Sequence, residues 1–210
     1  MTSLVLHDYE LDDGCYKVRL LLSMIGLAHK AIAVDVHPGR EHLSPRYRRL
    51  SPQGALPILE DGALVLYGAE AILAYLAHRY DPARTWLPEE HAAFGRVLQW
   101  LAFAAGALQP AARARWHHML EVEADAAAVD RAARAAFRVM DDHMTVRELD
   151  DASWFTGGAP TIADLALFPA IALSRDFGIE HEEYPALRRW IRRVRALPGF
   201  VTMPGIPSYA

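Results

Sequence analysis

The sequence predicts an α+β fold in which a small sheet with its own helices precedes a bundle of helices. Three observations point to this class. Short apolar runs within residues 1–80 alternate with segments of helical spacing. An Asp-Gly pair separates two of these runs, as in a tight hairpin. After residue 90 every periodic segment is helical, and Ala-rich runs favour helix there. We therefore expect domains at 1–80 and 91–210, joined by a linker at 81–90.

The first unit is predicted to be strand, helix, strand. Leu4–Tyr9 forms the first strand, and apolar residues recur at helical spacing through Cys15–Gly26, where the glycine ends the helix. Ala31–Val36 alternates as a second strand. A crossover through a helix favours a right-handed connection, so the two strands should be parallel.

Ser51–Ala77 is then predicted to be strand, turn, strand and helix. Asp61 and Gly62 lie between the apolar runs 56–59 and 63–66, and we expect both to be central turn residues with positive φ. A helix follows at Gly68–Tyr80. The preceding residues, 37–50, should form a loop with at most a short helix. This βαβ-ββα order is that of a thioredoxin-like domain.

Pro57 stands at the entrance of the third strand and has two interpretations. A trans proline is tolerated at a strand edge, because it cannot donate a ladder hydrogen bond. A cis Leu56–Pro57 bond would instead turn the chain and leave the N–H and C=O of Leu56 facing outward, free to pair with another peptide backbone.

Two prolines within Asp81–Pro88 mark the linker, and the rest of the chain is predicted to be helical. Thr161 and Asp164 have the spacing of a capping box, so loss of Asp164 should cost about 1 to 2 kcal/mol. The expected helices are His91–Leu120, Val122–Leu149, Thr161–Arg175 and Pro185–Leu197.

The composition excludes several classes of function. The chain has 210 residues, a formal charge of −4 and a pI near 6.2, which gives no basic footprint for nucleic acid or an anionic membrane. No apolar run is long enough to span a bilayer, and the amino terminus lacks the basic segment of a signal peptide. A single cysteine, Cys15, fits a reducing compartment, so we expect a cytoplasmic protein.

The motif Ser-Pro-Gln-Gly-Ala-Leu-Pro at residues 51–57 resembles the segment before the cis-proline of glutathione S-transferases. The helix with Ala71-Ile72 and the later segment from Gly157 to Pro169 match the same family in the right order. The chain is therefore identified as a bacterial member of the glutathione S-transferase superfamily. The resemblance implies glutathione as cofactor and a homodimer between one partner's first domain and the other's helical domain.

The resemblance also places the thiol-activating residue in the loop after the first strand, where this chain departs from the family. The usual Ser or Cys position falls on Asp12, whose ionised carboxylate cannot donate a hydrogen bond to a thiolate. Cys15 lies near a helix amino terminus, where the dipole would lower its pKa, or it is a buried small hydrophobe. Tyr9, at the end of the first strand, is the remaining catalytic candidate.

The expected glutathione contacts are mostly backbone. Leu56 and Pro57 would hold the peptide, and the start of the next helix, at Ala69 and Glu70, would hold a carboxylate. The family's acid or amide followed by Ser is replaced here by Gly68-Ala69, so the hydroxyl is missing. Glu70 either favours the helix start or contacts ligand. We expect a site diverged from the family pattern.

Aromatic residues of the helical part are candidates for the wall of a substrate site or for the core. They are Trp100, Phe103 and Trp116. His117 and His118 are adjacent and point apart on a helix, so no metal site is expected. The last helix has an apolar stripe and five arginines between residues 188 and 195, which solvation explains adequately.

Three functions are compatible with these residues. The first is transfer of the glutathione thiol to a small hydrophobic electrophile. The second is a glutathione-independent lyase, isomerase or cyclase that uses Asp12 or a histidine as general base. The third is a binding protein without catalysis. Each takes a small-molecule partner, without nucleic acid or membrane.

Overall fold

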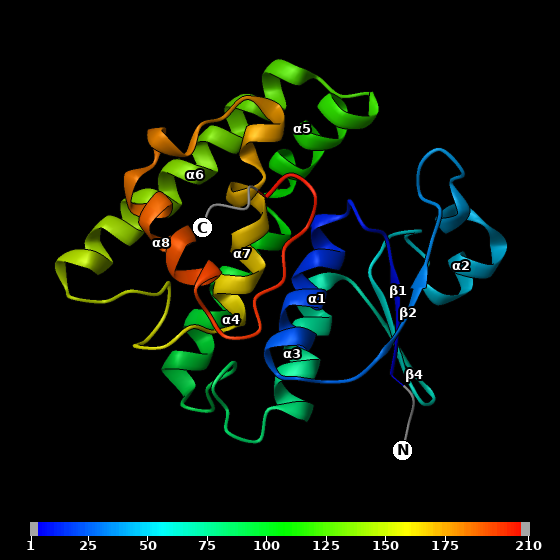
Figure 1. Ribbon diagram of the computed structural model, residues 1–210, viewed down its shortest axis with the longest axis horizontal. Helices are drawn as coiled ribbons and strands as arrows, with labels where there is room; N and C mark the ends of the chain where they lie inside the picture. Colours follow the sequence, from blue (N-terminus) through cyan, green and yellow to red (C-terminus); the bar gives the residue numbers. More distant parts are fainter. Residues whose placement is uncertain (1–3, 207–210) are drawn as a thin grey trace.

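A four-stranded mixed sheet forms the centre of the first part of the chain (Figure 1). The computed structural model describes residues 4–206. The strands are β1 (Leu4–Asp8), β2 (Lys30–Ala33), β3 (Ile58–Asp61) and β4 (Leu64–Tyr67), in the order β2-β1-β3-β4. β1 is parallel to β2 and antiparallel to β3, and β3 is antiparallel to β4. The predicted parallel βαβ unit is therefore present.

Helices cover both faces of this sheet. α1 (Asp13–Met24) and α3 (Ala69–Tyr80) pack together on the face toward the helical part, and the short α2 (Pro45–Leu50) lies on the other face (Figure 1). Tyr47 of α2 is buried there with Val34 and Ile58. A short 3₁₀ turn at Glu41–Leu43 precedes α2. The α+β class predicted from the sequence is confirmed.

The β3–β4 hairpin differs in detail from the sequence prediction. Asp61 is the last residue of β3 and pairs with Leu64, so the two loop residues are Gly62 and Ala63. Of these two, only Gly62 has positive φ, at 61°. A two-residue loop with glycine at its first position is the pattern of a type II′ turn, which does not require positive φ at both positions.

The helical part consists of five α-helices within the described residues. The expected helix over 91–120 is divided in two at Gly106, because Gly106 ends the first helix and Pro110 lies in the first turn of the second, where a proline needs no N–H. The helices are α4 (His91–Ala105), α5 (Gln109–Leu120), α6 (Ala126–Leu149), α7 (Ile162–Ala172) and α8 (Pro185–Arg195), with 3₁₀ turns at Ser174–Phe177 and His181–Glu183.

α7 joins the two parts of the molecule. All its residues are buried, and it packs against α1 and α3 as well as α4. The segment after α8 runs back over α1, where the Tyr16 hydroxyl donates to the carbonyl of Val201 at 2.6 Å (Figure 1). One apolar core therefore continues from the sheet into the helices. Over residues 4–206, no helix has the length and apolar character needed to cross a membrane.

Candidate functional site

A cavity of about 310 Å³ opens between the sheet part and α5. Its volume lies at the lower end of the range of small-molecule pockets. The first part of the chain contributes Asp12, Asp13, Val36, His42, Gly54, Ala55 and Leu56, and the helical part contributes Gln109, Ala112, Arg113, Trp116, Val122 and Glu123. We call this cavity the cleft.

The cis-proline loop forms one wall of the cleft. The Leu56–Pro57 bond is cis, and neither the N–H nor the C=O of Leu56 has a hydrogen-bond partner within residues 4–206. A Cβ on Gly14 would lie 3.2 Å from Pro57 Cδ and 3.6 Å from Ala69 Cβ, so the loop before α1, the proline and the start of α3 meet here. An unpaired backbone edge of this kind can accept an extended peptide.

Asp12 caps the amino terminus of α1 and faces the cleft. Its Oδ1 accepts a hydrogen bond from the Cys15 N–H at 2.7 Å, which satisfies one of the helix's free donors. Burial, with the nearby Asp13 carboxylate, raises the pKa of Asp12 to about 7. The side chain therefore exchanges its proton near neutral pH, as a general base does.

The loop that carries Asp12 is held by the helical part. Arg115 of α5 is buried, forms an ion pair with Asp176 at 2.7 Å, and donates to the carbonyl of Leu11. Because Leu11 directly precedes Asp12, this arginine fixes the position of the carboxyl group relative to α5.

Cys15 does not have the environment expected for a thiolate. Its side chain is fully buried, and its sulfur accepts a hydrogen bond from the Tyr9 N–H at 3.4 Å. Burial and the charge of Asp12 raise the pKa of the thiol well above its ordinary value. Of the two interpretations of Cys15, the structure therefore agrees with the buried small residue and not with a thiol of lowered pKa.

Tyr9 is half-buried beside the cleft. Its ring contacts Trp116 edge to face, with centroids 6.0 Å apart. Burial and the charge of Asp35 raise the pKa of the hydroxyl, so Tyr9 is a neutral hydrogen-bond donor at physiological pH.

The start of α3 is held by an ion pair that the sequence analysis did not predict. The Glu70 Oε1 atom accepts from Lys17 Nζ at 2.9 Å, and Asp13 Oδ2 lies 4.0 Å from the same nitrogen. Burial lowers the pKa of Lys17, but these two carboxylates outweigh it and raise the pKa overall. Gly68 offers no side-chain cap. The N–H groups of the first turn, at Ala69 and Glu70, are therefore free of a capping side chain.

The aromatic candidates separate into core and cleft. Trp100 is buried in the core, edge to face with Phe155 and Phe103, and neither Trp100 nor Phe103 lines the cleft. Their assignment to a substrate wall is therefore not supported by their positions. Trp116 lines the cleft directly.

Three of the four residues of α5 that line the cleft were missed in the sequence analysis. Gln109, Ala112, Arg113 and Trp116 stand at positions i, i+3, i+4 and i+7, which places them on one helix face. Trp116 was recognised, so the same spacing would have identified Gln109 and Arg113 as its neighbours. On the opposite wall, the Nδ1 atom of His42 is buried and has no hydrogen-bond partner among residues 4–206. Burial and the charges of Arg40 and Arg48 lower the pKa of His42, so its ring is neutral.

Comparisons with known proteins agree on one family. Residues 6–84 match the family model "Glutathione S-transferase, N-terminal domain", and residues 103–198 match "Glutathione S-transferase, C-terminal domain". The chain is 30% identical over 199 residues to the glutathione S-transferase-like protein tpcF of Aspergillus fumigatus, covering 87% of each chain.

Solved structures show the same similarity. A possible glutathione S-transferase from Rhodopseudomonas palustris superposes with a TM-score of 0.84 at 28% identity, covering 95% of this chain and 97% of the other. A glutathione transferase homologue from Lodderomyces elongisporus, crystallised with two glutathione molecules per subunit, has a TM-score of 0.85 at 24% identity and covers 95% and 96%. At 24% identity, the match to the Lodderomyces elongisporus protein shows a shared fold only.

Proposed function

The chain belongs to the glutathione S-transferase superfamily as a glutathione S-transferase-like protein, and from this we propose that it transfers the glutathione thiol to a small hydrophobic electrophile in the cleft. One observation carries the proposal. The unpaired Leu56 backbone and the Asp12 carboxyl group lie on one wall of the cleft, and Arg113 and Trp116 of α5 lie on the other.

Glutathione would be held mainly by backbone groups. The N–H and C=O of Leu56 would pair with its central cysteinyl residue, as in strand addition. The open amino terminus of α3, at Ala69 and Glu70, would receive the γ-glutamyl carboxylate. Because Ala69 has no hydroxyl group, the site has diverged from the family pattern, and we expect binding to be weaker than in members that have one.

The other carboxylate of glutathione has two partners in the same cleft. Arg113 supplies a positive charge from α5, and His42 supplies a neutral ring whose buried Nδ1 atom has no partner in the described part of the chain. A charge-assisted hydrogen bond to an arginine is about twice as strong as one between neutral groups. Arg113 is therefore proposed to compensate in part for the lost hydroxyl.

Asp12 is proposed to act as the general base. With an aromatic halide as the electrophile, Asp12 accepts the proton of the glutathione thiol. The sulfur then forms a bond to the ring carbon that carries the halogen, and the halide ion leaves. A thiol with a pKa near 8.5 gives its proton to a carboxylate with a pKa of about 7 at a cost of about 2 kcal/mol, which is small for a catalysed step. Cys15 has no part in this reaction.

Trp116 is proposed as the wall that contacts the electrophile. In a conjugation assay with glutathione and an aromatic halide, Trp116→Ala should raise the KM for the halide about tenfold, because a buried aromatic contact is lost. Trp154→Ala removes a half-buried tryptophan that does not line the cleft, and it should leave this KM within about twofold. Equal effects of the two variants would contradict the assignment.

A homodimer in the cytoplasm of a bacterium is proposed as the working form. Exposed apolar side chains support the dimer: Leu64, Val65 and Tyr67 on β4 and Phe94 and Leu98 on α4 are each 37–40% exposed. Two copies related by a twofold axis can place the β4 residues of each against the α4 residues of the other. The single cysteine supports a reducing compartment.

Sedimentation velocity tests this interface. Leu98→Glu puts a charge into the proposed contact and should shift the protein to monomer. Val139→Glu is the matched control, because Val139 is an apolar residue of α6, 51% exposed, that lies outside the proposed contact. This variant should leave the dimer intact. A wild-type protein that sediments as a monomer at micromolar concentration would contradict the proposal.

A glutathione-independent lyase, isomerase or cyclase is the second candidate. It is favoured by the pKa of Asp12, which suits a base for a carbon acid as well as for a thiol. In that case glutathione would neither bind nor inhibit, and Asp12 would still be essential for turnover.

A further inference from the structure

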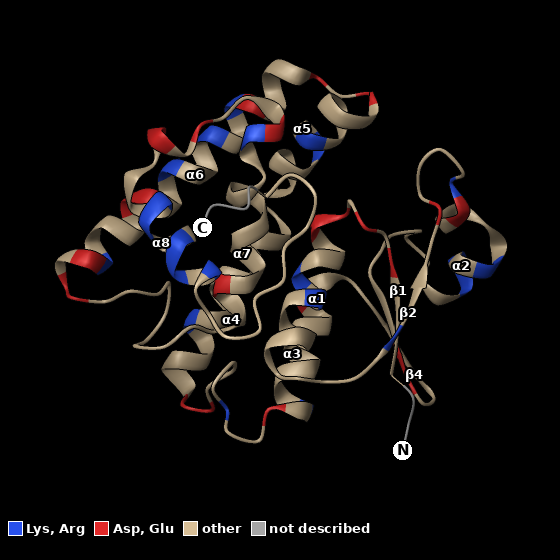
Figure 2. Ribbon diagram, in the orientation of Figure 1, with Lys and Arg blue, Asp and Glu red and all other residues tan. Residues whose placement is uncertain are grey.

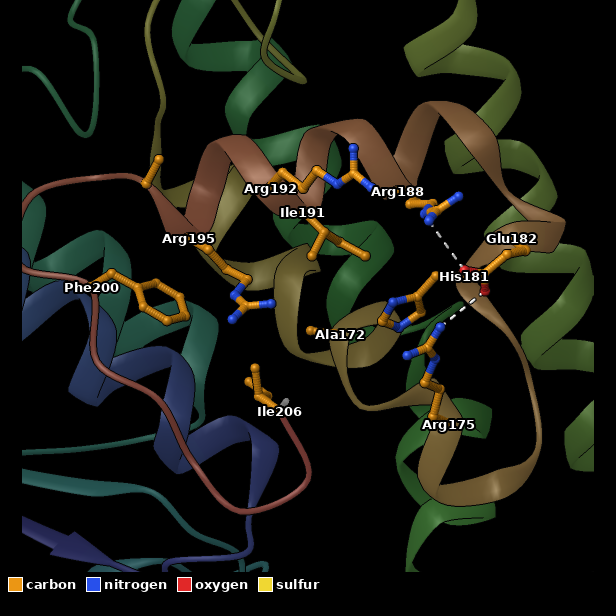
Figure 3. Close-up of a pocket in the computed structure, with 11 residues that line it drawn as sticks. Ala172, Arg175, His181, Glu182, Arg188, Ile191, Arg192, Arg195, Phe200 and Ile206 are labelled. Carbon is orange, nitrogen blue, oxygen red and sulfur yellow. Dashed lines mark hydrogen bonds and ion pairs between the residues drawn. The ribbon is translucent and has the colours of Figure 1, made fainter. Parts of the chain in front are cut away.

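The chain returns from the helical part to the first part after α8. Residues 197–206, which we call the C-terminal strap, run back along α1 (Figure 1). They contain no charged side chain (Figure 2), so the strap meets charged neighbours through its backbone. Phe200 and Ile206 point into the hollow beside α8 (Figure 3). The strap therefore packs on the helical part with its apolar side chains while it reaches α1.

Two close contacts hold the strap on α1. A Cβ on Gly199 would lie 2.9 Å from Met24 Cα and 3.0 Å from the carbonyl oxygen of Ser23, so the strap approaches the end of α1 as closely as a glycine allows. Further along, the Tyr16 hydroxyl donates to the carbonyl of Val201 at 2.6 Å. Tyr16 is fully buried, so little water can compete for this bond.

The far end of the strap lies against an ion pair of the helical part. Arg115 of α5 and Asp176 are 2.7 Å apart, and Arg115 Nη2 donates to the carbonyl of Pro204 at 3.4 Å. A Cβ on Gly205 would lie 2.5 Å from Asp176 Oδ2, so a larger residue would displace either the strap or the carboxylate. The strap and the ion pair are therefore in direct contact.

Arg115 connects the strap to the loop that carries Asp12. Its Nε atom donates to Asp176, its Nη2 atom to the strap and its Nη1 atom to the carbonyl of Leu11. The guanidinium group is planar and its donors have fixed directions, so the three acceptors must keep their positions relative to one another. Because Arg115 is buried, bulk water does not replace an acceptor that moves away.

The position of Asp12, which follows Leu11, can be measured directly. Its Oδ1 atom accepts from the Cys15 N–H at 2.7 Å. The first N–H groups of a helix have no acceptor within the helix, so the Asp12 side chain is what protects this amide from exchange with solvent. Exchange at Cys15 therefore reports whether the Asp12 carboxyl group is in place.

We propose that the C-terminal strap keeps Asp12 in its catalytic position, and that Arg115 is the positioning residue through which the strap acts. This inference rests on the proposed role of Asp12 as general base. Glutathione is proposed to bind through the Leu56 backbone and the start of α3, and Arg115 makes its three hydrogen bonds elsewhere. A disturbed strap should therefore lower turnover more than it weakens glutathione binding.

Amide hydrogen exchange of the full chain, followed by NMR, tests this connection without glutathione. Tyr16→Phe removes the hydroxyl that holds Val201 and leaves every residue that lines the cleft unchanged. It should speed exchange at Cys15 about fivefold, the scale of one lost hydrogen bond. The Ala128 amide, which Asp125 caps in the same way at 3.0 Å in α6, is the internal reference and should stay within about twofold.

Tyr184→Phe is the matched control for Tyr16→Phe. It also removes the hydroxyl of a buried tyrosine, but that hydroxyl donates to the carbonyl of Arg134 in α6, at 3.5 Å, and not to the strap. Exchange at Cys15 should stay within about twofold of the wild type. An equal rise at Cys15 in Tyr16→Phe and Tyr184→Phe would overturn the proposal.

Arg115→Lys separates positioning from stability. Lysine keeps a positive charge opposite Asp176, so the fold should be retained, but one ammonium group cannot serve the three acceptors in their present positions. Exchange at Cys15 should rise at least about fivefold. In the conjugation assay with an aromatic halide, kcat should fall about tenfold, because a misplaced catalytic group slows the chemical step. The dissociation constant for glutathione should stay within about twofold.

The results that would overturn the proposal are distinct from those that would overturn the transfer reaction. Unchanged exchange at Cys15 in either Tyr16→Phe or Arg115→Lys would show that the strap does not hold Asp12. An equal rise at Cys15 and Ala128 would show a general loss of stability and would also overturn it. If the wild type does not bind glutathione, the transfer reaction is wrong, and the exchange rates still decide whether the strap positions Asp12.

Discussion

In the proposed reaction, one carboxyl group decides how the thiol loses its proton. Asp12 stands where the resembled family has a hydroxyl or thiol, and its pKa of about 7 follows from burial and from Asp13. A hydroxyl stabilises a thiolate by donating a hydrogen bond, whereas an ionised carboxylate removes the proton. The sequence identified the substitution, but the pKa depends on how deeply α1 is packed, which only the structure gives.

The pH dependence of turnover tests this role. The kcat/KM of the wild type should rise with pH through about 7, as Asp12 loses its proton. The kcat/KM of Asp12→Asn should lack that rise and should instead follow the ionisation of the glutathione thiol. At pH 7 it should be about 10²-fold lower than the kcat/KM of the wild type. Asp13→Asn is the matched control. It removes a neighbouring negative charge, so it should move the rise to lower pH and retain activity. Identical profiles for the wild type and Asp12→Asn would exclude a base at this position.

At the scale of elements, local signals predicted helices well and their breaks poorly. The Thr161–Asp164 capping box was predicted and is present at the start of α7. Asp164 also accepts from the Phe155 N–H at 3.1 Å and from Trp190 Nε1 at 2.9 Å. Those two bonds join α7 to distant segments, so no local pattern could have indicated them. The division between α4 and α5, by contrast, follows from two local residues, Gly106 and Pro110, which the sequence analysis did not use as a helix break.

The added bonds increase the expected cost of removing Asp164. Asp164→Ala would leave three buried donors unsatisfied, so the free energy of unfolding should fall by about 4 kcal/mol rather than the value for one cap. Urea denaturation measures this. Asp125→Ala, which removes an exposed cap of α6 that bonds Ala128 at 3.0 Å, should cost about 1 kcal/mol. Equal losses in the two variants would show that the buried bonds add nothing.

At the scale of the whole molecule, the fold followed from the sequence because its motifs occur in order along nearly the full length. The cleft was only half predicted. Residues near Leu56 and Asp12 were identified from the motifs, but Arg113 and Gln109 reach the cleft through the packing of α5 against the first part of the chain. The hollow beside α8, lined by Arg188, Arg192 and Arg195, was not predicted, because a basic helix face has the same sequence pattern whether it meets water or a cavity wall.

The measurement that tests the central claim most directly is a calorimetric titration of the wild-type protein with glutathione, repeated with Arg113→Ala. The backbone of Leu56, the start of α3 and the charge of Arg113 predict a dissociation constant between about 1 μM and a few millimolar, weakened at least about tenfold in the variant. Absence of binding at about 10 mM glutathione would mean that the changes at Asp12 and Ala69 have abolished the glutathione site, and the proposed transfer reaction would be wrong.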